Sequence, residues 1–539
     1  MKTIKPFRLL LVMLLFACHA IGVTGGTRFN DHVGKLFILG GELSNSAATS
    51  VADIDDVMPR MAALGLNTVL VPAYWDLIEP VEGQYDWTLV DHVIEKAREC
   101  KLQVVFLWFG VWKNSMSCYA PLWFKQDTKR FPRAMTKNGK PLEIASAFSE
   151  NVFQADCKVF TKLVEHLAQK DPQKKTVIML QIENEIGMLE EARDYSPLAE
   201  SFHRKSQYPD TLEGDETFMA EHYARYVERL AQVARKVYDV PLYVNAAMNS
   251  RGRKPGEYPS AGPLAHLAPI WKKYAPSIDM LAPDIYDTGF KGWARQYALP
   301  DNPLFIPESR CCENSGVRAL YSFGAFDAIG FSPFAIDQSP SEDTYHVKEA
   351  YDLIWQMKGY LLKAREQAWK KGRWQQDNGQ WGVLFDHEDR EEIISDGNIV
   401  LTCRHFFTLP WDARAKADKW AEGGAIIYKV APHEYLIAGS GVVVEFKTKS
   451  ELQQEERKTL GEDGFVDKGN VDSSSSSSVG EVRWQGKRIG IGYVDQVEID
   501  DDGNLKYIRR DNGDQDHQGR HARISVGEYK ILHVKLYDY

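Results

Sequence analysis

Eight short apolar runs, each followed by a segment of helical periodicity, dominate the first 390 residues and constrain the fold more than any other feature. In residues 86–100 and 218–238, for example, apolar side chains recur every three or four positions. Strands that alternate with helices in this number predict a (β/α)8 barrel, an α/β fold. A doubly wound sheet is the alternative, but it usually has fewer strands and a glycine-rich phosphate loop. Neither GxGxxG nor GxxxxGKS/T follows the first run. The runs are Lys35–Glu42, Asn67–Trp75, Gln103–Gly110, Thr176–Glu185, Pro241–Asn249, Asp279–Tyr286, Pro303–Arg310 and Ala328–Asp337.

The pattern changes after about residue 390. β-Branched and polar residues alternate over residues 425–448, and short strand patterns joined by an Asp-Gly-Asn turn follow over 482–510. We therefore predict a barrel over residues 26–390 and a C-terminal antiparallel, sandwich-like β-domain over residues 391–539. The serine-rich stretch Asp472–Gly480 is of low complexity and is interpreted as a loop within the β-domain.

The N-terminus has the pattern of a secretory signal peptide, predicted over residues 1–25. Basic residues precede an apolar run, Leu9–Ala17, and small residues follow it. The run is too short to span a bilayer comfortably. We expect export to the periplasm, the cell surface or the medium of a bacterium. Cys18 resembles the cysteine of a lipoprotein box, although Phe16 fits that box poorly, so an outer-membrane lipid anchor stays open.

Charge and cysteine content exclude two classes of protein. The net charge of −10 argues against a nucleic-acid-binding protein, which usually presents a basic face. The six cysteines beyond Cys18 show no CxxC spacing, which argues against a zinc cluster. Which of them could form disulfides cannot be read from their spacing.

Carboxylates, amides and aromatic side chains gather where the predicted strands end. In a (β/α)8 barrel these ends form the mouth that carries the active site. No histidine is among them, whereas a metal hydrolase would normally show several histidines and aspartates there. The residues at the ends are Glu42, Tyr74, Trp75, Glu79, Trp112, Asn114, Asn184, Glu185, Asn245, Asn249, Asp284, Tyr286, Glu308, Ser332 and Phe334.

This combination suits the cleavage of a glycosidic bond. One carboxylic acid must protonate the leaving oxygen, and a second carboxylate must attack the sugar or activate water. Amides and hydroxyls bind sugar hydroxyls, and aromatic faces stack on sugar rings. The fourth and seventh strands lie across the mouth from each other, so Glu185 and Glu308 can approach one bond from opposite sides.

The stretch "QIENE" holds two glutamates, and strand geometry does not by itself decide between them. In a regular strand Glu183 and Glu185 would share one face and Asn184 would point to the other. Strand ends often bend, however. Glu185 comes last and is nearer the mouth, whereas Glu183 lies deeper and is interpreted as a paired structural acid.

The motifs resemble those of retaining glycosidases built on (β/α)8 barrels. An Asn-Glu pair ends the fourth strand, Asn184-Glu185, and a lone glutamate, Glu308, ends the seventh. "VPAYWDLIEPVEGQYDW" resembles the second-strand motif of glycoside hydrolase families 35 and 42, which are β-galactosidases, and "QIENEIG" resembles the acid/base motif of family 35. Together with "GGELSNSA" and "LWFGVWKNSMS", these motifs favour a bacterial branch of family 35.

The resemblance implies roles for individual residues. Glu185 would be the general acid/base and Glu308 the nucleophile. Asn184 would bind the sugar 2-hydroxyl, and Tyr286 would help to hold the charge state of the nucleophile. Two departures leave the exact sugar open: Trp112-Lys113-Asn114 stands where better-known members have Cys-Ala-Glu, and Pro72 stands where they have a tyrosine.

The remaining candidates carry two interpretations each. Asn114 and Glu42 are candidate ligands of sugar hydroxyls, and Glu42 could instead cap the next helix. The aromatic rings of Tyr74, Trp75 and Trp112 are candidate sugar platforms or plain core. Glu79 is interpreted as a structural acid.

These observations predict an exo-acting retaining β-galactosidase that releases terminal galactose from plant-type oligo- or polysaccharides. Its partner is the carbohydrate substrate, and it needs no metal or organic cofactor. Another retaining glycosidase of the same clan, such as an arabinosidase, fucosidase or endo-galactanase, is the alternative. A non-catalytic carbohydrate-binding barrel is a further one. Retention predicts carboxyl groups about 5–5.5 Å apart and a raised pKa for the acid. The oligomeric state stays open.

Overall fold

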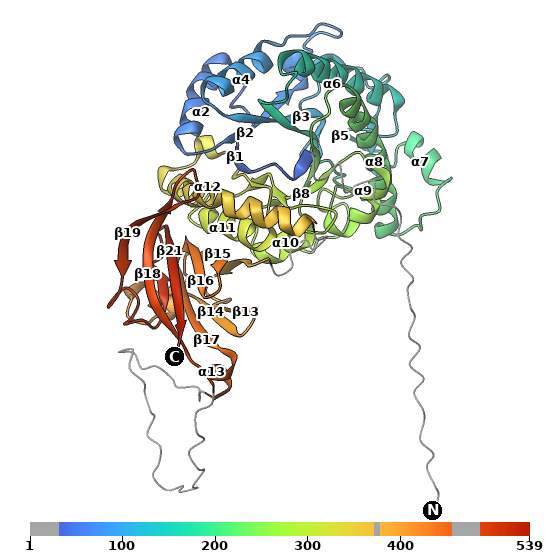
Figure 1. Ribbon diagram of the computed structural model, residues 1–539. Coiled ribbons are helices and arrows are strands. Elements are labelled where there is room, and N and C mark those ends of the chain that lie inside the picture. Colours follow the sequence, from blue (N-terminus) through green and yellow to red (C-terminus); the bar gives the residue numbers. More distant parts are fainter. Residues whose placement is uncertain (1–31, 371–377, 455–485) are drawn as a thin grey trace, which may run out of the picture.

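A computed structural model describes residues 32–370, 378–454 and 486–539, which form a barrel followed by two antiparallel sheets (Figure 1). The predicted signal peptide, Cys18 and the serine-rich stretch lie outside these described residues.

The barrel is a ring of parallel strands, as predicted. Around the ring the order is β10-β8-β7-β6-β3-β2-β1-β11-β9. The seventh run is split at Pro307, which has no N–H to donate to a ladder. Its first half pairs with β11 and its second half with β8, so residues 305–309 close the ring. The (β/α)8 prediction is therefore confirmed. The strands are β1 (Ile38–Glu42), β2 (Thr68–Tyr74), β3 (Gln103–Lys113), β6 (Val177–Asn184), β7 (Leu242–Ala247), β8 (Met280–Ile285), β9 (Phe305–Ile306), β10 (Glu308–Ser309) and β11 (Gly330–Phe331).

Helices cover the outside of the ring. Several begin at a serine or threonine whose side chain accepts a hydrogen bond from the first turn, as Ser50, Ser149 and Thr211 do. The larger helices are α2 (Val51–Ala63), α4 (Thr88–Glu99), α6 (Glu150–Lys170), α8 (Leu212–Val237), α9 (Ala268–Tyr274), α10 (Phe290–Tyr297), α11 (Ser315–Phe326) and α12 (Ser341–Lys370). Shorter elements in the loops are α3 (Trp75–Ile78), β4 (Arg133–Met135), β5 (Pro141–Ala145), α5 (Leu122–Gln126) and α7 (Pro197–His203).

The C-terminal part contains one six-stranded and one four-stranded antiparallel sheet, which confirms the predicted β-domain. The first sheet has the order β12-β15-β16-β21-β18-β19 and the second β13-β14-β17-β20. The strands are β12 (Gln380–Phe385), β13 (Glu391–Asp396), β14 (Ile399–His405), β15 (Gly423–Ala431), β16 (Glu434–Ser440), β17 (Val442–Thr448), β18 (Ile489–Ile499), β19 (Leu505–Asp511), β20 (Ala522–Ile524) and β21 (Lys530–Asp538); α13 (Lys449–Gln454) follows β17.

Strands β12, β15 and β16 of the six-stranded sheet are largely buried on both faces, and this joins the two parts of the molecule. Alternate residues of β15 point in opposite directions: Ile426 belongs to the barrel's hydrophobic core, whereas Ile427 belongs to the core between the two sheets. An ion pair of 2.6 Å between Arg318 of α11 and Glu422 crosses the same boundary.

Helix α12 is tied firmly to the barrel. The hydroxyl of Tyr351 lies 2.7 Å from the carbonyl oxygens of both Gly40 and Phe331, on β1 and β11. Arg365 is buried against Asp327, with 2.9 Å between Nε and Oδ1. Figure 1 shows α12 between the barrel and the sheets.

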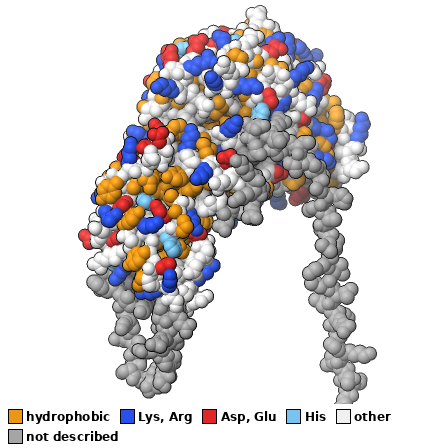
Figure 2. Space-filling view, viewed as in Figure 1, with side chains coloured by type: hydrophobic (Ala, Val, Ile, Leu, Met, Phe, Trp, Pro, Cys, Tyr) orange, Lys and Arg blue, Asp and Glu red, His pale blue; other side chains and the backbone are white. Residues whose placement is uncertain are grey.

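The surface is mixed in character. Figure 2 shows basic and acidic side chains interspersed over the barrel and more hydrophobic side chains on the β-domain, where Tyr507, Ile508 and Tyr537 are exposed. No helix in the described ranges is long and apolar enough to cross a membrane. The six cysteines in those ranges are free thiols.

Candidate active site

Polar side chains from six barrel strands converge at the mouth, most of them buried. Glu42 ends β1, Lys113 ends β3, and Asn184 and Glu185 come at the end of β6. Strands β7, β8 and β10 add further groups. The contributing side chains are those of Glu42, Lys113, Asn114, Asn184, Glu185, Asn245, Asp284, Tyr286 and Glu308.

The end of β6 departs from regular strand geometry. Glu183 and Glu185 both have left-handed backbone conformations, with φ of 57° and 45°. Such values are uncommon for residues with a side chain and mark positions that the surrounding structure holds. The strand end therefore bends, and the shared face of a regular strand does not occur: Asn184 and Glu185 reach the mouth together, whereas the carboxyl group of Glu183 lies on the helix side of the sheet.

Glu183 belongs to a buried acid pair behind the mouth. One of its oxygens accepts a 2.7 Å hydrogen bond from the backbone N–H of Trp112. Asp156 of α6 accepts hydrogen bonds from the indole of Trp108 (2.9 Å) and the hydroxyl of Tyr226 (2.7 Å). Burial, and then the neighbouring Asp156, raise the pKa of Glu183 well above its usual range. Burial raises the pKa of Asp156 as well, and we therefore expect the pair to hold a proton on Glu183.

Three donors converge on the carboxylate of Glu308. The amides of Asn184 and Asn245 donate to Oε1 over 3.2 and 3.1 Å, and the hydroxyl of Tyr286 donates to Oε2 over 2.7 Å. Glu308 is 3% exposed. Donors placed this closely hold both oxygens of the carboxylate in one orientation.

Glu185 is held by groups from two neighbouring strands. Its backbone N–H donates to Asn245 over 3.0 Å, and its carboxyl accepts from the amide of Asn114. Burial, and then the charge of Glu308, raise the pKa of Glu185 to about 7, although Lys113 opposes the rise. This is the direction expected of a general acid.

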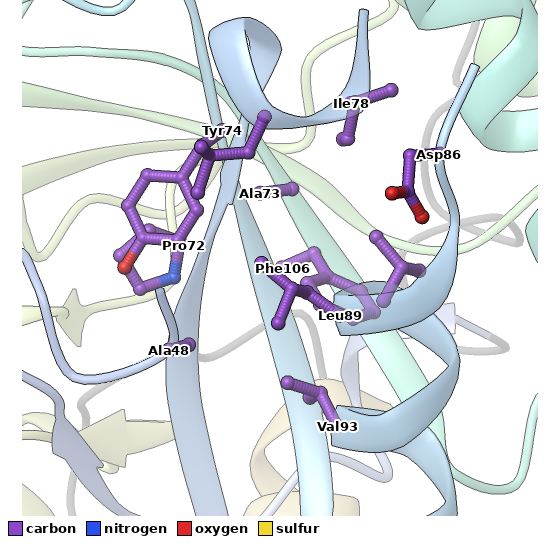
Figure 3. Close-up of a pocket in the computed structure, with 11 residues that line it drawn as sticks. Ala48, Pro72, Ala73, Tyr74, Ile78, Asp86, Leu89, Val93 and Phe106 are labelled. Carbon is purple, nitrogen blue, oxygen red and sulfur yellow. The ribbon is translucent and has the colours of Figure 1, made fainter. Parts of the chain in front are cut away.

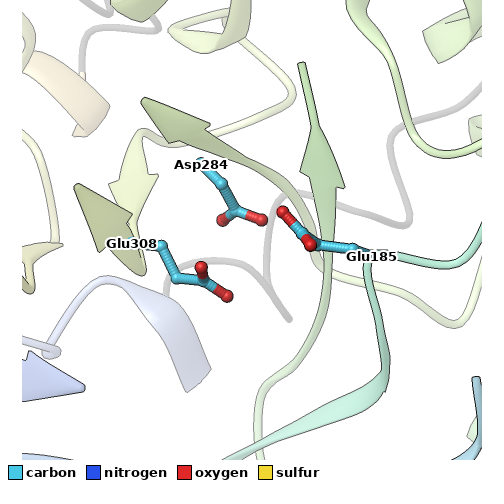
Figure 4. Close-up of side chains that lie close together, drawn as sticks. All are labelled: Glu185, Asp284 and Glu308. Carbon is cyan, nitrogen blue, oxygen red and sulfur yellow. The ribbon is translucent and has the colours of Figure 1, made fainter. Parts of the chain in front are cut away.

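Two further acids complete the cluster. Burial, and then Glu308, raise the pKa values of both Asp284 and Glu42 well above the usual range. Figure 4 shows the carboxyl groups of Glu185, Asp284 and Glu308 turned toward one another. One oxygen of each lies within 4.8 Å of the others. A cation could bridge such a trio, but N–H and O–H donors already contact the Glu308 oxygens, and the ammonium of Lys113 brings a positive charge to the cluster.

Lys113 contributes a cation to this cluster. Burial alone would lower the pKa of Lys113, but the surrounding carboxylates, those of Glu308 and Glu185 foremost, raise it above its usual value. The side chain is on the inner face of β3, where its Nζ lies 5.1 Å from the ring centroid of Phe109.

The structure places three predicted aromatic ligands in packing layers, which corrects those predictions. Trp112 is fully buried and packs edge-on against Tyr223 and Tyr226 of α8. Trp75 donates to Glu79 over 2.9 Å and packs against Trp123. A large indole ring buries more of its apolar surface between the sheet and the helices than it would at the mouth.

Tyr74 is also buried, at 3% exposure, with its ring against Phe109 and Tyr119. Figure 3 shows it beside Pro72 at a mostly apolar cavity of about 140 Å³ between β2, β3 and α4. This cavity is separate from the acid cluster.

Sequence reasoning assigned no role to Lys113, Asn245 or Asp284. A signal for Lys113 was present: alternation along β3 places Phe109 and Lys113 on the same face and Trp112 on the other. Asn245 and Asp284 stood among the strand ends, but only their contacts distinguish them from the other residues there.

Comparisons with known proteins point to the same chemistry. Residues 47–232 match the model of glycoside hydrolase family 42, described as beta-galactosidase. The resemblance to family 35 is not confirmed, and family 42, which shares the second-strand motif, fits better. Residues 347–523 match a family described as a domain of unknown function, DUF5597. No curated protein matches the chain.

Two β-galactosidases are among the solved structures that match. One, described as polyextremophilic, comes from the Antarctic haloarchaeon Halorubrum lacusprofundi; it is 17% identical with a TM-score of 0.42, over 59% of this chain and 58% of that one. The other is a catalytic mutant of Gan42B, a GH42 β-galactosidase from G. stearothermophilus, at 14% identity and a TM-score of 0.47, over 60% and 57%. This chain thus spans little more than half the length of either. Residues 47–232, which carry Glu185, are therefore similar to glycoside hydrolase family 42, and they form part of a (β/α)8 barrel.

Proposed function

We propose that this chain is an exo-acting, retaining β-galactosidase that releases terminal galactose from plant-type oligo- or polysaccharides. The carrying observation is the approach of Glu185 and Glu308, whose nearest carboxyl oxygens lie within 4.8 Å. Retaining glycosidases hold their two carboxyl groups about 5–5.5 Å apart, whereas inverting enzymes need about 6.5–9.5 Å to admit a water molecule.

In the first step a Glu308 oxygen bonds to the anomeric carbon as the glycosidic bond breaks. The proton of Glu185 moves to the leaving oxygen. In the second step Glu185 takes a proton from water, the water oxygen bonds to the anomeric carbon, and the bond to Glu308 breaks. The donors on Glu308 hold it in place for attack. Among the described residues no donor contacts the buried Oδ1 of Asn184, which can accept from a sugar hydroxyl.

The test is hydrolysis of aryl glycosides that differ only in the sugar, followed by NMR of the first-formed product. We expect the β-galactoside to react fastest and to release the β-anomer. Release of the α-anomer would refute retention. Preference for an arabinoside or fucoside, or cleavage only within galactan chains, would assign the chain to one of the alternative activities.

Azide separates the roles of the two glutamates. With Glu308→Ala, azide fills the space of the nucleophile and should give the α-galactosyl azide. With Glu185→Ala, azide replaces water on the intermediate and should give the β-product. Glu313 is an exposed acid in the loop that follows β10, so Glu313→Ala is the matched control and should behave as the wild type.

We also propose export directed by residues 1–25. Cell fractionation and N-terminal sequencing test it: a mature chain that starts near residue 26 supports export. A start at lipid-modified Cys18 supports an anchor, and a cytoplasmic chain with Met1 intact contradicts export.

A further inference from the structure

Lys113 is a buried ammonium group that lacks a close partner. The residue is 4% exposed. Within the ranges that the structure describes, no hydrogen bond or ion pair within 4.0 Å holds its Nζ, although its backbone bonds both ways with Met116. An ammonium has three N–H donors, and leaving them unused in a buried position is costly. Such a group calls for acceptors that arrive from outside the protein.

The acceptors must come to the proposed sugar site. Lys113 faces the barrel interior, and the acids whose charges act on it are Glu308, Glu185, Glu42 and Asp284. Two of these are the proposed nucleophile and the proposed acid/base. A ligand that binds between Glu185 and Glu308 would therefore lie in the same part of the barrel mouth as the ammonium group of Lys113.

The charges around Lys113 favour a neutral ligand. Burial pushes Glu42 and Asp284 toward their neutral forms and does the same to Glu185 below about pH 7. Among the described residues, Lys113 is the cation whose charge acts on Glu185 and Glu42, and the proposed mechanism requires Glu308 as an anion. A sugar with its own carboxylate would add a second buried anion without a second cation.

We propose that Lys113 is a substrate-binding, specificity-determining residue whose ammonium donates to hydroxyl oxygens of the bound sugar, and that it selects neutral sugars over uronic acids. This inference rests on the proposed glycosidase function and deepens it. Lys113 directly precedes Asn114. The end of β3 therefore contributes one residue that would bind the substrate and one that donates to Glu185.

The test compares wild type with Lys113→Met and Lys113→Gln on aryl β-galactoside and aryl β-galacturonide. Methionine keeps the stem but removes the charge and the donors, whereas glutamine restores donors without charge. We expect Lys113→Met to lose about 10- to 100-fold in kcat/KM on the neutral substrate, the worth of one charge-assisted hydrogen bond. Lys113→Gln should fall between it and the wild type. Wild type should hydrolyse the galacturonide at least about 100-fold less well.

Lys125→Met is the matched control, because this lysine lies outside the acid cluster and contacts the Cys118 carbonyl. Calorimetric binding of a galactose-configured iminosugar to folded wild type and variants gives a second readout that does not need turnover. Equal kcat/KM and equal binding for Lys113→Met and the wild type would overturn the inference, as would a preference for the galacturonide. If wild type hydrolyses no glycoside of the panel, the proposed function fails instead. The iminosugar comparison then decides the role of Lys113 alone.

Discussion

Replacing Glu183 with glutamine should leave the protein nearly as stable and active as the wild type, whereas Asp156→Asn should damage it. We expect the two acids to hold one proton on Glu183, because burial and the neighbouring Asp156 raise the pKa of Glu183 well above its usual range. A glutamine at this position reproduces the hydrogen bonds of protonated Glu183, because its NH2 group can donate to Asp156 and its oxygen can accept from the Trp112 N–H. The free energy of unfolding should change by less than about 1 kcal/mol.

Asp156 has the opposite requirement. Its two oxygens accept from Trp108 and Tyr226, so an asparagine would turn an NH2 group toward one of these donors. One buried donor is then unsatisfied, at about 1–3 kcal/mol. Glu183→Leu leaves the buried Trp112 N–H without its acceptor and removes the proton that Glu183 would donate to Asp156, which should cost about 3 kcal/mol or more. It should also lower kcat about 100-fold, because the kink that places Asn184 and Glu185 relaxes.

Urea unfolding and kcat/KM on an aryl galactoside measure these effects side by side. Glu150→Gln, a substitution of an exposed acid on the same helix as Asp156, serves as the control. The reasoning fails if Glu183→Gln is as harmful as Glu183→Leu, or if Asp156→Asn is milder than Glu183→Gln. Either result would mean that the proton resides on Asp156, or that the acid pair does not stabilise the end of β6.

The alkaline limb of kcat/KM should have its midpoint near pH 7, because the acid form of Glu185 is lost as the pH rises through its raised pKa. In Glu308→Gln the titration of Glu185, followed by ¹³C NMR, should move to lower pH, since the charge that disfavours its ionisation is gone; an unmoved titration contradicts the coupling. Tyr286→Phe removes one donor from the Glu308 carboxylate and should lower kcat/KM about 10- to 100-fold with unchanged thermal stability; a loss of stability instead would point to a packing role. Trp112→Ala should cost about 3–5 kcal/mol in urea unfolding and leave KM unchanged, and a raised KM would restore its role as a sugar platform. A chain ended at residue 370 should be insoluble, because it exposes the apolar side of α11 and α12 that the six-stranded sheet covers; a soluble, folded barrel would contradict the shared core.

The barrel could be predicted because its evidence is local. Each strand is a short apolar run and each helix has a periodic face, and the strand ends follow directly. The placement of Glu185 and Glu308 also follows from the chain, since both stand where a run stops. The closing strand is less visible: its split at Pro307 depends on partners from β8 and β11 that no local pattern reveals.

The rest of the site depends on contacts across the barrel. The left-handed backbone at Glu183 reverses the expected facing of "QIENE", and it is held by α6 and by the end of β3, both distant in sequence. Alternation along a strand places Trp112 and Lys113 on opposite faces. The apolar run that predicted this strand stops at Gly110, however, three residues before β3 ends. The amide of Asn245 donates to both Glu308 and Asp284, and composition cannot reveal such contacts.

Helix α12 belongs both to the barrel and to the segment that matches DUF5597. It completes the ring of barrel helices through Tyr351 and Arg365, yet the similarity to DUF5597 begins at residue 347, inside this helix. The segment that matches DUF5597 and the segment that packs as part of the barrel therefore overlap along most of α12. An exchange of the β-domain between relatives would have to carry the helix with it and replace part of the barrel wall. The two halves are consequently expected to diverge in concert, with substitutions on one side of α12 matched on the other.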